Sequence, residues 1–203
     1  MLGHDFEGDE DHFSPEERNQ LTFANNRIFK HKTLQVNYTT YDLRRAQDSL
    51  NPRTHADFMT LAHEDDDEHR KHPFWYGRIL GIFHAMVQYT GPCSCSVDPQ
   101  RMEFLWVRWY GRDLDHVGGW KAKHLHRVGF VDSEDPAAFG FLDPQEVIRG
   151  VHLIPAFAHG KTADPLPSNS MARTQCENHE DWQHFYISML VNFISLLHFA
   201  DCV

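Results

Sequence analysis

Cysteine is scarce in this chain, and its placement excludes a disulfide framework. Only four cysteines occur in 203 residues, and Cys93 and Cys95 are too close together for an ordinary bridge. The N-terminus is acidic rather than basic and then apolar, so we expect no secretory leader. Because disulfides are rare in reducing compartments, these features favour an intracellular location.

Sequence motifs for catalysis and metal binding are absent as well. The chain has no Gly-x-Ser-x-Gly elbow, no phosphate-binding glycine loop and no His-x-x-x-His pair. Structural zinc sites use two pairs of ligands, whereas this chain offers the single pair Cys93 and Cys95, which His84 or His116 would have to complete. We therefore expect no enzyme, no metal ion, no cofactor and no small-molecule substrate.

Basic residues are outnumbered by acidic ones. There are 19 Lys and Arg against 29 Asp and Glu, which gives a net charge of −10. Non-specific DNA binding needs basic side chains that displace phosphate counterions, so the overall acidity argues against it. The charge is uneven, however: residues 73–130 hold seven bases and four acids, and residues 131–203 hold three bases and ten acids. A local basic face in the centre stays compatible with this pattern.

Charged residues are missing from the run Gln183–Ala200. Its eighteen residues nominally reach the length of a transmembrane helix, but Ser188, Asn192 and Ser195 interrupt it. One interpretation is a membrane anchor. The interpretation that we favour is a strand over 182–191 followed by an apolar tail, without a membrane partner.

Short runs with strand character make up most of the remaining sequence. Ser14-Pro15 and Asp143-Pro144 are typical helix starts, with Ser14 and Asp143 as N-caps. The fold class predicted is mainly β: a small antiparallel, partly closed SH3-like barrel with two or three short helices. The predicted strands are 34–40, 58–62, 74–88, 102–110, 120–131 and 151–154.

Four parts are expected along the chain. They are an acidic N-terminal extension with a short helix at 1–32, the barrel domain at 33–160, a loop at 161–181, and a final strand plus apolar tail at 182–203.

The run 105–113 holds the densest set of aromatic residues. Alternation places Leu105, Val107 and Trp109 on one face and Trp106, Arg108 and Tyr110 on the other. The second face either covers a second small core or forms a groove that holds a cationic peptide by cation–π attraction. The acidic run 64–68 would then supply charge partners. The peptide-binding candidates are Trp75, Tyr76, Trp106, Trp109 and Tyr110, with Asp65, Asp66 and Asp67.

A second group of candidates is basic. On a strand over 120–131, Lys121, Lys123 and Arg127 would share one side and could contact phosphates. The alternative is a solvated strand edge, whose charges block edge-to-edge pairing. The nucleic-acid candidates are Arg108, Arg112, Lys121, Lys123 and Arg127.

Two segments resemble the core strands of bromo-adjacent homology (BAH) domains. They are Tyr76-Gly77-Arg78-Ile79-Leu80 and Val107-Arg108-Trp109-Tyr110, and the helix expected at 144–149 followed by Val151–Pro155 resembles the end of that fold. The chain departs from the family pattern at Gly111-Arg112-Asp113, where an Arg-Pro pair is usual. The resemblance implies a BAH-like barrel.

A resemblance over most of the chain is to the C-terminal region of Plavaka-type and KDZ-type transposon-encoded proteins of mushroom-forming fungi. It implies a fragment without the N-terminal zinc-finger and nuclease parts. Residues 190–203 depart from the family, and they are a native tail, a membrane anchor or translated intron sequence. The segments that carry the resemblance are Asn37–Asp42, Asp48–His55, Phe74–Tyr76, Phe104–Trp109 and Gly140–Phe157.

The sequence thus predicts a non-catalytic interaction module of a transposon-derived, nuclear protein. Its expected partner is a basic peptide, for example of chromatin. The alternatives are a DNA-contacting accessory domain of a transposase and a vestigial fragment without function.

Overall fold

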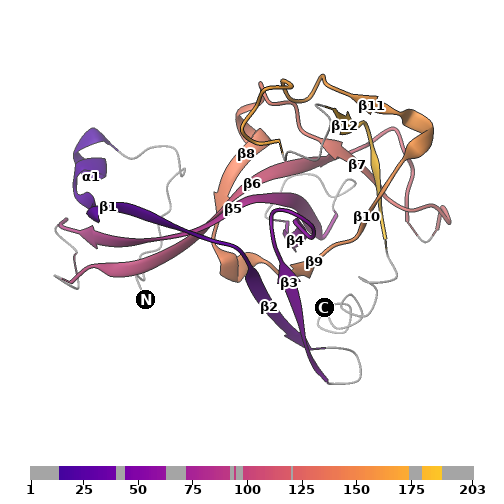
Figure 1. Ribbon diagram of the computed structural model, residues 1–203. Coiled ribbons are helices and arrows are strands. Elements are labelled where there is room, and N and C mark those ends of the chain that lie inside the picture. Colours follow the sequence, from indigo (N-terminus) through magenta and orange to yellow (C-terminus); the bar gives the residue numbers. More distant parts are fainter. Residues whose placement is uncertain are drawn as a thin grey trace. The chain divides into compact units, whose positions relative to one another are not determined.

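The computed structural model describes residues 14–39, 44–62, 72–91, 94, 98–119, 121–173 and 180–188 (Figure 1). Of these residues, 54% lie in strands and 9% in helices, and the sheets are antiparallel. The prediction of a mainly β fold is therefore confirmed.

The largest element is a nine-stranded sheet (Figure 1). Its central path runs in the order β10-β13-β7-β6-β5-β4-β9, while β1 pairs with β5 and β8 pairs with β6. The strands are β1 (Leu21–His31), β4 (Asp57–Leu61), β5 (Phe74–Tyr89), β6 (Gln100–Arg112), β7 (Arg127–Phe130), β8 (Phe139–Leu142), β9 (Arg149–Gly150), β10 (Leu153–Pro155) and β13 (Phe185–Ile187).

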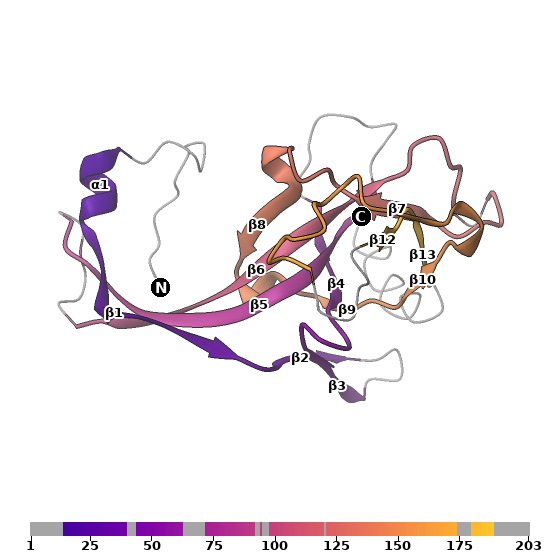
Figure 2. The same ribbon diagram turned by 45° about the horizontal axis from the view of Figure 1, so that its top comes forward.

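Two small two-stranded sheets accompany it. Strand β2 (Leu34–Thr39) pairs with β3 (Arg45–Leu50) from Leu34 opposite Leu50 to Thr39 opposite Arg45, and Figure 2 shows the two strands side by side. Strand β11 (Lys161–Thr162) pairs with β12 (Asp181–Trp182), which sets Lys161 opposite Trp182.

The chain divides into two compact units, to which β5 and β6 both contribute. The first unit consists of residues 1–29 and 83–103, and it contains the helix α1 (Pro15–Asn19). The second unit consists of residues 30–82 and 104–203, and it contains every site discussed below.

Over residues 105–110, both faces of β6 pack against the interior, each against its own hydrophobic core. Leu105 and Val107 lie fully buried in a core with Phe58, which we call the Leu105 core. Tyr110 lies in a second core with Phe130, which we call the Tyr110 core. The alternation predicted for this strand is correct, and its second face covers a second core.

The sheet does not close into a barrel among the described residues, so this part of the prediction is wrong. The path ends at β9 and β10, which are edge strands and do not pair with each other. Only Val151 and His152 separate these two strands in sequence. The chain passes directly from one edge to the other, and a continuous extended segment cannot form a ladder with itself.

The expectation of two or three short helices is also wrong. The described residues contain the five-residue α1 and three 3₁₀ turns of three residues each, η1 (Pro136–Ala138), η2 (Pro144–Glu146) and η3 (Phe157–His159). The side chain of Asp143 does cap η2, because it accepts from the backbone N–H of Gln145. Val147 then takes an extended conformation, with φ −72° and ψ 113°, and ends the turn.

The strand predicted over 120–131 is reduced to the four residues of β7. Residues 121–123 form a turn, and Lys123 has a positive φ of 55°. A left-handed residue interrupts the pleat, so Lys121, Lys123 and Arg127 do not share one side of a strand.

Gly77 of β5 is required by close packing. A Cβ atom at this position would lie 2.7 Å from two ring atoms of Phe58 and 3.1 Å from the Trp109 ring. Phe58 is fully buried and cannot move aside. A Cβ at Gly111 of β6 would instead meet Val131 Cγ2 at 3.6 Å, which is an ordinary contact.

We therefore expect Gly77→Ala to lower the free energy of unfolding by about 1–3 kcal/mol through overpacking. The matched variant Gly111→Ala should leave it unchanged or raise it slightly, because alanine restricts the unfolded chain. Urea denaturation of both variants measures the difference. Equal effects at the two positions would contradict this packing.

Candidate functional site

A buried ion-pair network lies beneath the Tyr110 core. Arg108 of β6 is 2% exposed, and its guanidinium donates to Asp181 of β12 over 2.8 Å. Arg173 places a second guanidinium nitrogen 3.2 Å from the other oxygen of the same carboxylate. Burial lowers the pKa of Arg108, and the Asp181 carboxylate opposes this effect. One aspartate thus holds two arginines in a place that excludes water.

A second network lies beside the first. Arg78 of β5 donates to Asp57 of β4 over 2.8 Å, and the Tyr110 hydroxyl donates to the same carboxylate over 2.9 Å. Burial raises the pKa of Tyr110 well above its ordinary value. Asp57 is therefore held as an acceptor by two donors from adjacent strands.

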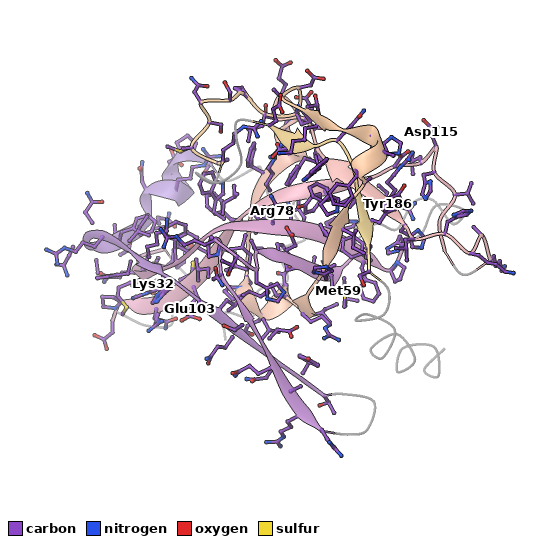
Figure 3. All side chains as sticks on the ribbon, turned by 45° about the vertical axis from the view of Figure 1, so that its right-hand side comes forward. Lys32, Met59, Arg78, Glu103, Asp115 and Tyr186 are labelled. Carbon is purple, nitrogen blue, oxygen red and sulfur yellow. The ribbon has the colours of Figure 1, made fainter. Side chains whose placement is uncertain are left out.

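The guanidinium groups of these networks lie over aromatic rings. The Arg108 guanidinium carbon is 3.7 Å from the centroid of Phe130. The Arg78 guanidinium carbon is 5.0 Å from Phe130 and 5.8 Å from Phe185. These distances are those of cation–π contacts. The chain's own arginines therefore occupy the ring faces of this core, and Figure 3 shows Arg78 on the central sheet.

The predicted ring residues are not brought together in one groove. Tyr76 and Tyr110 are buried in the Tyr110 core. Trp75 and Trp109 are half-buried and touch each other edge to face, with centroids 6.0 Å apart. Trp106 is half-buried against Phe139 of β8. The predicted acidic partners Asp65, Asp66 and Asp67 lie outside the described residues.

The predicted basic residues are divided as well. Arg108 belongs to the buried network. Arg127 donates to Asp113 over 2.6 Å, and Arg112 is half-buried at the end of β6. Lys121 and Lys123 are exposed. Four of the five residues therefore lie within or directly beside the loop 113–126, and Arg108 lies in the interior.

A cavity of about 290 Å³ opens beside the two networks. The register of β11 and β12 places Lys161 opposite Trp182 in its lining, and the Lys161 ammonium lies 5.1 Å from the centroid of the Trp182 ring. Glu180, next in sequence to the buried Asp181, is exposed. The lining residues are Asp57, Arg78, Leu153, Pro155, Lys161, Glu180, Asp181, Trp182 and Phe185. We call this cavity the Trp182 pocket.

The Trp182 pocket was not predicted from the sequence. Its walls come from β4, β5, β10, β11, β12 and β13, which are far apart along the chain. Lys161 and Glu180 fall in the segment expected to be a loop. The one local signal is the Asp181-Trp182 dipeptide, which pairs an acid with a large ring.

Two histidines form a half-buried pair at the edge of the Tyr110 core. His72 packs edge to face against His126, with ring centroids 4.8 Å apart, and its Nδ1 lies 3.0 Å from the carbonyl oxygen of Phe74. Burial lowers the pKa of His72 to about 4, and burial also lowers the pKa of His126. The fold therefore favours the neutral form of both rings.

Comparisons with known proteins give no neighbour for this chain. No family model matches it, and neither a curated protein nor a solved structure is significantly similar to it. Within the described ranges, no cluster of three or more His, Cys, Asp or Glu side chains is placed to hold a metal ion. The same ranges contain no helix long and apolar enough to cross a membrane.

Neutralising Asp181 should be costly, because it leaves two buried guanidiniums without their counter-charge. We expect Asp181→Asn to lower the free energy of unfolding by about 3 kcal/mol. The adjacent exposed variant Glu180→Gln should change it by less than about 0.5 kcal/mol. Thermal and urea unfolding of both variants measures this, and similar small effects at the two positions would count against the network.

The His72 environment predicts acid destabilisation. The unfolded chain binds a proton at His72 below pH 6.5, whereas the folded chain does so only near pH 4. Stability should therefore fall as the pH drops from 6.5 to 4, by up to about 3 kcal/mol from this residue. His72→Gln should flatten that part of the stability profile, while His55→Gln, at an exposed turn, should not. If stability depends on pH equally steeply in His72→Gln, the loss of stability in acid does not come from His72.

Proposed function

We propose that this chain is a non-catalytic binding module for a basic peptide, and that a lysine or arginine side chain of the peptide docks on Trp182. The observation that carries the proposal is the position of Lys161. Its ammonium lies over the Trp182 ring, 5.1 Å from the centroid, and both residues line the 290 Å³ pocket. The chain's own lysine thus occupies the position that a peptide cation would take.

The charge of Glu180 supports a cationic ligand. Glu180 is an exposed residue of the pocket lining, whereas Asp57 in the same lining is already paired with Arg78. If a peptide cation displaces Lys161 from the ring, it meets the same aromatic face and the Glu180 carboxylate. An exposed lysine on a short strand costs little to displace, because cation–π contacts at exposed sites are worth about 0.5–1 kcal/mol.

Trp182 is a ring that a peptide can reach more easily than the rings of the Tyr110 core. Arg78 and Arg108 already cover Phe130, and Tyr110 is buried. A peptide could reach these rings only by breaking buried ion pairs, at a cost of several kcal/mol. The proposed ligand is still the basic peptide predicted from the sequence, but the residues that bind it are those of the Trp182 pocket.

The cellular setting that we propose for this function rests on the sequence resemblance to transposon-encoded proteins. A histone-like tail is therefore the first peptide to test, and a nuclear location in a transposon-derived protein belongs to the same proposal. Trimethyl-lysine is the side chain best suited to an aromatic face, because its charge is retained and its hydration is weak.

The test is fluorescence anisotropy with a labelled twelve-residue basic peptide that contains one trimethyl-lysine. An unmodified twin and a twin with glutamate at that position serve as ligand controls. We expect Lys161→Ala to tighten binding by about 2–5-fold, because it vacates the ring. Trp182→Leu should weaken binding by about tenfold or more.

Trp106→Leu is the matched protein control, because it removes a half-buried indole that does not line the pocket. It should leave the affinity unchanged. The proposal fails if the glutamate twin binds equally well, if Trp182→Leu binds like the parent, or if millimolar peptide gives no signal.

A further inference from the structure

Histidine is over-represented in this chain, and the fold gathers the scattered residues. Sixteen histidines occur in 203 residues. His116 and His124 of the loop 113–126 touch each other, with ring centroids 6.1 Å apart, and His116 also touches Tyr186 of β13 at 5.9 Å. Figure 3 shows Asp115 on this loop and Tyr186 on its strand.

A second histidine pair adjoins the first. His159 of η3 and His184 lie edge to face, with centroids 5.0 Å apart. The Arg127 guanidinium donates to His159 Nε2 over 2.8 Å, and His184 Nδ1 lies 3.9 Å from a carboxylate oxygen of Asp113. His116 packs against Tyr186, two residues from His184 in sequence, so both pairs lie at the start of β13.

The half-buried pair of His72 and His126 adjoins this cluster, because His126 belongs to the same loop as His116 and His124. We call the whole surface the histidine face. Its titratable and charged members are His72 and Tyr76 near the start of β5; Arg112 of β6; Asp113, Asp115, His116, Lys121, Lys123, His124 and His126 of the loop; Arg127 of β7; His159 of η3; and His184 and Tyr186 at β13.

The histidine face is basic in a chain that is acidic overall. Residues 112–127 contain four Lys and Arg against two Asp, whereas the whole chain carries −10. Asp113 and Arg127 form an ion pair, so their charges largely cancel: burial raises the pKa of Asp113, but the hydrogen bond and charge of Arg127 outweigh this and lower it. Lys121, Lys123 and His124 are exposed on the loop.

We propose that the histidine face binds the phosphodiester backbone of a nucleic acid, and that it binds more tightly in mildly acidic solution. Lys121 and Lys123 supply permanent positive charge, and the exposed imidazole of His124 supplies charge when it is protonated. This site shares no residue with the Trp182 pocket, so it goes beyond the proposed peptide-binding function.

The direction of the pH effect follows from linkage. A phosphate held near an imidazole favours the protonated ring, so the complex takes up protons that the free protein does not hold at neutral pH. Affinity must then rise as the pH falls through the titration range of histidine, near 6.5. Lysine contacts contribute at both pH values, because lysine stays charged throughout.

The experiment is fluorescence anisotropy of the full chain with a labelled 20-nucleotide single-stranded DNA, at pH 7.5 and pH 6.0 and constant ionic strength. We expect at least about fivefold tighter binding at pH 6.0, which corresponds to an average uptake of about half a proton over this pH range. His124→Gln should lose this gain, and Lys121→Gln/Lys123→Gln should weaken binding at both pH values.

Arg53→Gln/His55→Gln is the matched control, because both residues are exposed on a turn outside the face. It should behave like the parent. Circular dichroism at both pH values verifies the fold, and single Lys121→Gln replaces the double lysine variant if that variant is unfolded. Trp182→Leu should keep its DNA affinity, which separates this test from that of the peptide pocket.

Three results would overturn the proposal. They are equal DNA affinity at the two pH values, a pH gain that survives in the histidine variant, and binding of polyglutamate as tight as that of DNA. The last result would show attraction to any polyanion rather than recognition of phosphates.

Discussion

The ion pair of Asp181 with Arg108 and Arg173 is the constraint on which the rest of the second unit depends. Arg108 sits in the middle of β6 on a face that is buried in the Tyr110 core, and a buried guanidinium without a counter-charge would be strongly destabilising. Its partner lies 73 residues away, on β12. This pair therefore fixes β12 against the central sheet, and the pairing of β12 with β11 then brings Lys161 over Trp182. The Trp182 pocket therefore forms where Asp181 neutralises Arg108.

The same constraint explains where ligands can bind. Both faces of β6 are used for packing, and the aromatic rings of the Tyr110 core are covered by arginines of the chain itself. The two binding sites that we propose therefore lie at the periphery. The Trp182 pocket combines a ring with the exposed Glu180, which is why we propose a cationic ligand there. The histidine face combines lysines with histidines, which is why we propose an anionic one. The two proposed sites have opposite charge preferences and share no residue.

The sequence predicted those parts of the fold that local pattern determines. Alternation identified the strands near 58–62, 74–88 and 102–110, and it separated Leu105 and Val107 from Arg108 and Tyr110 correctly. It missed β1 and β3, because strands with mostly exposed polar residues, such as Arg45–Leu50, carry no apolar period. It overestimated the helix after Asp143, whose cap forms although the turn ends at Val147.

The sites could not be predicted, because long-range pairing creates them. The partner of Arg108 was assigned to a loop, and the histidine face joins residues from His72 to His184. The most direct test of the central claim is arginine modification with phenylglyoxal, followed by peptide mass mapping. Arg108 has a side chain 2% exposed, whereas that of Arg101 is 52% exposed. Arg108 should stay unmodified until the protein unfolds, while Arg101 reacts. Modification of Arg108 in the folded protein at the rate of Arg101 would contradict the buried pair.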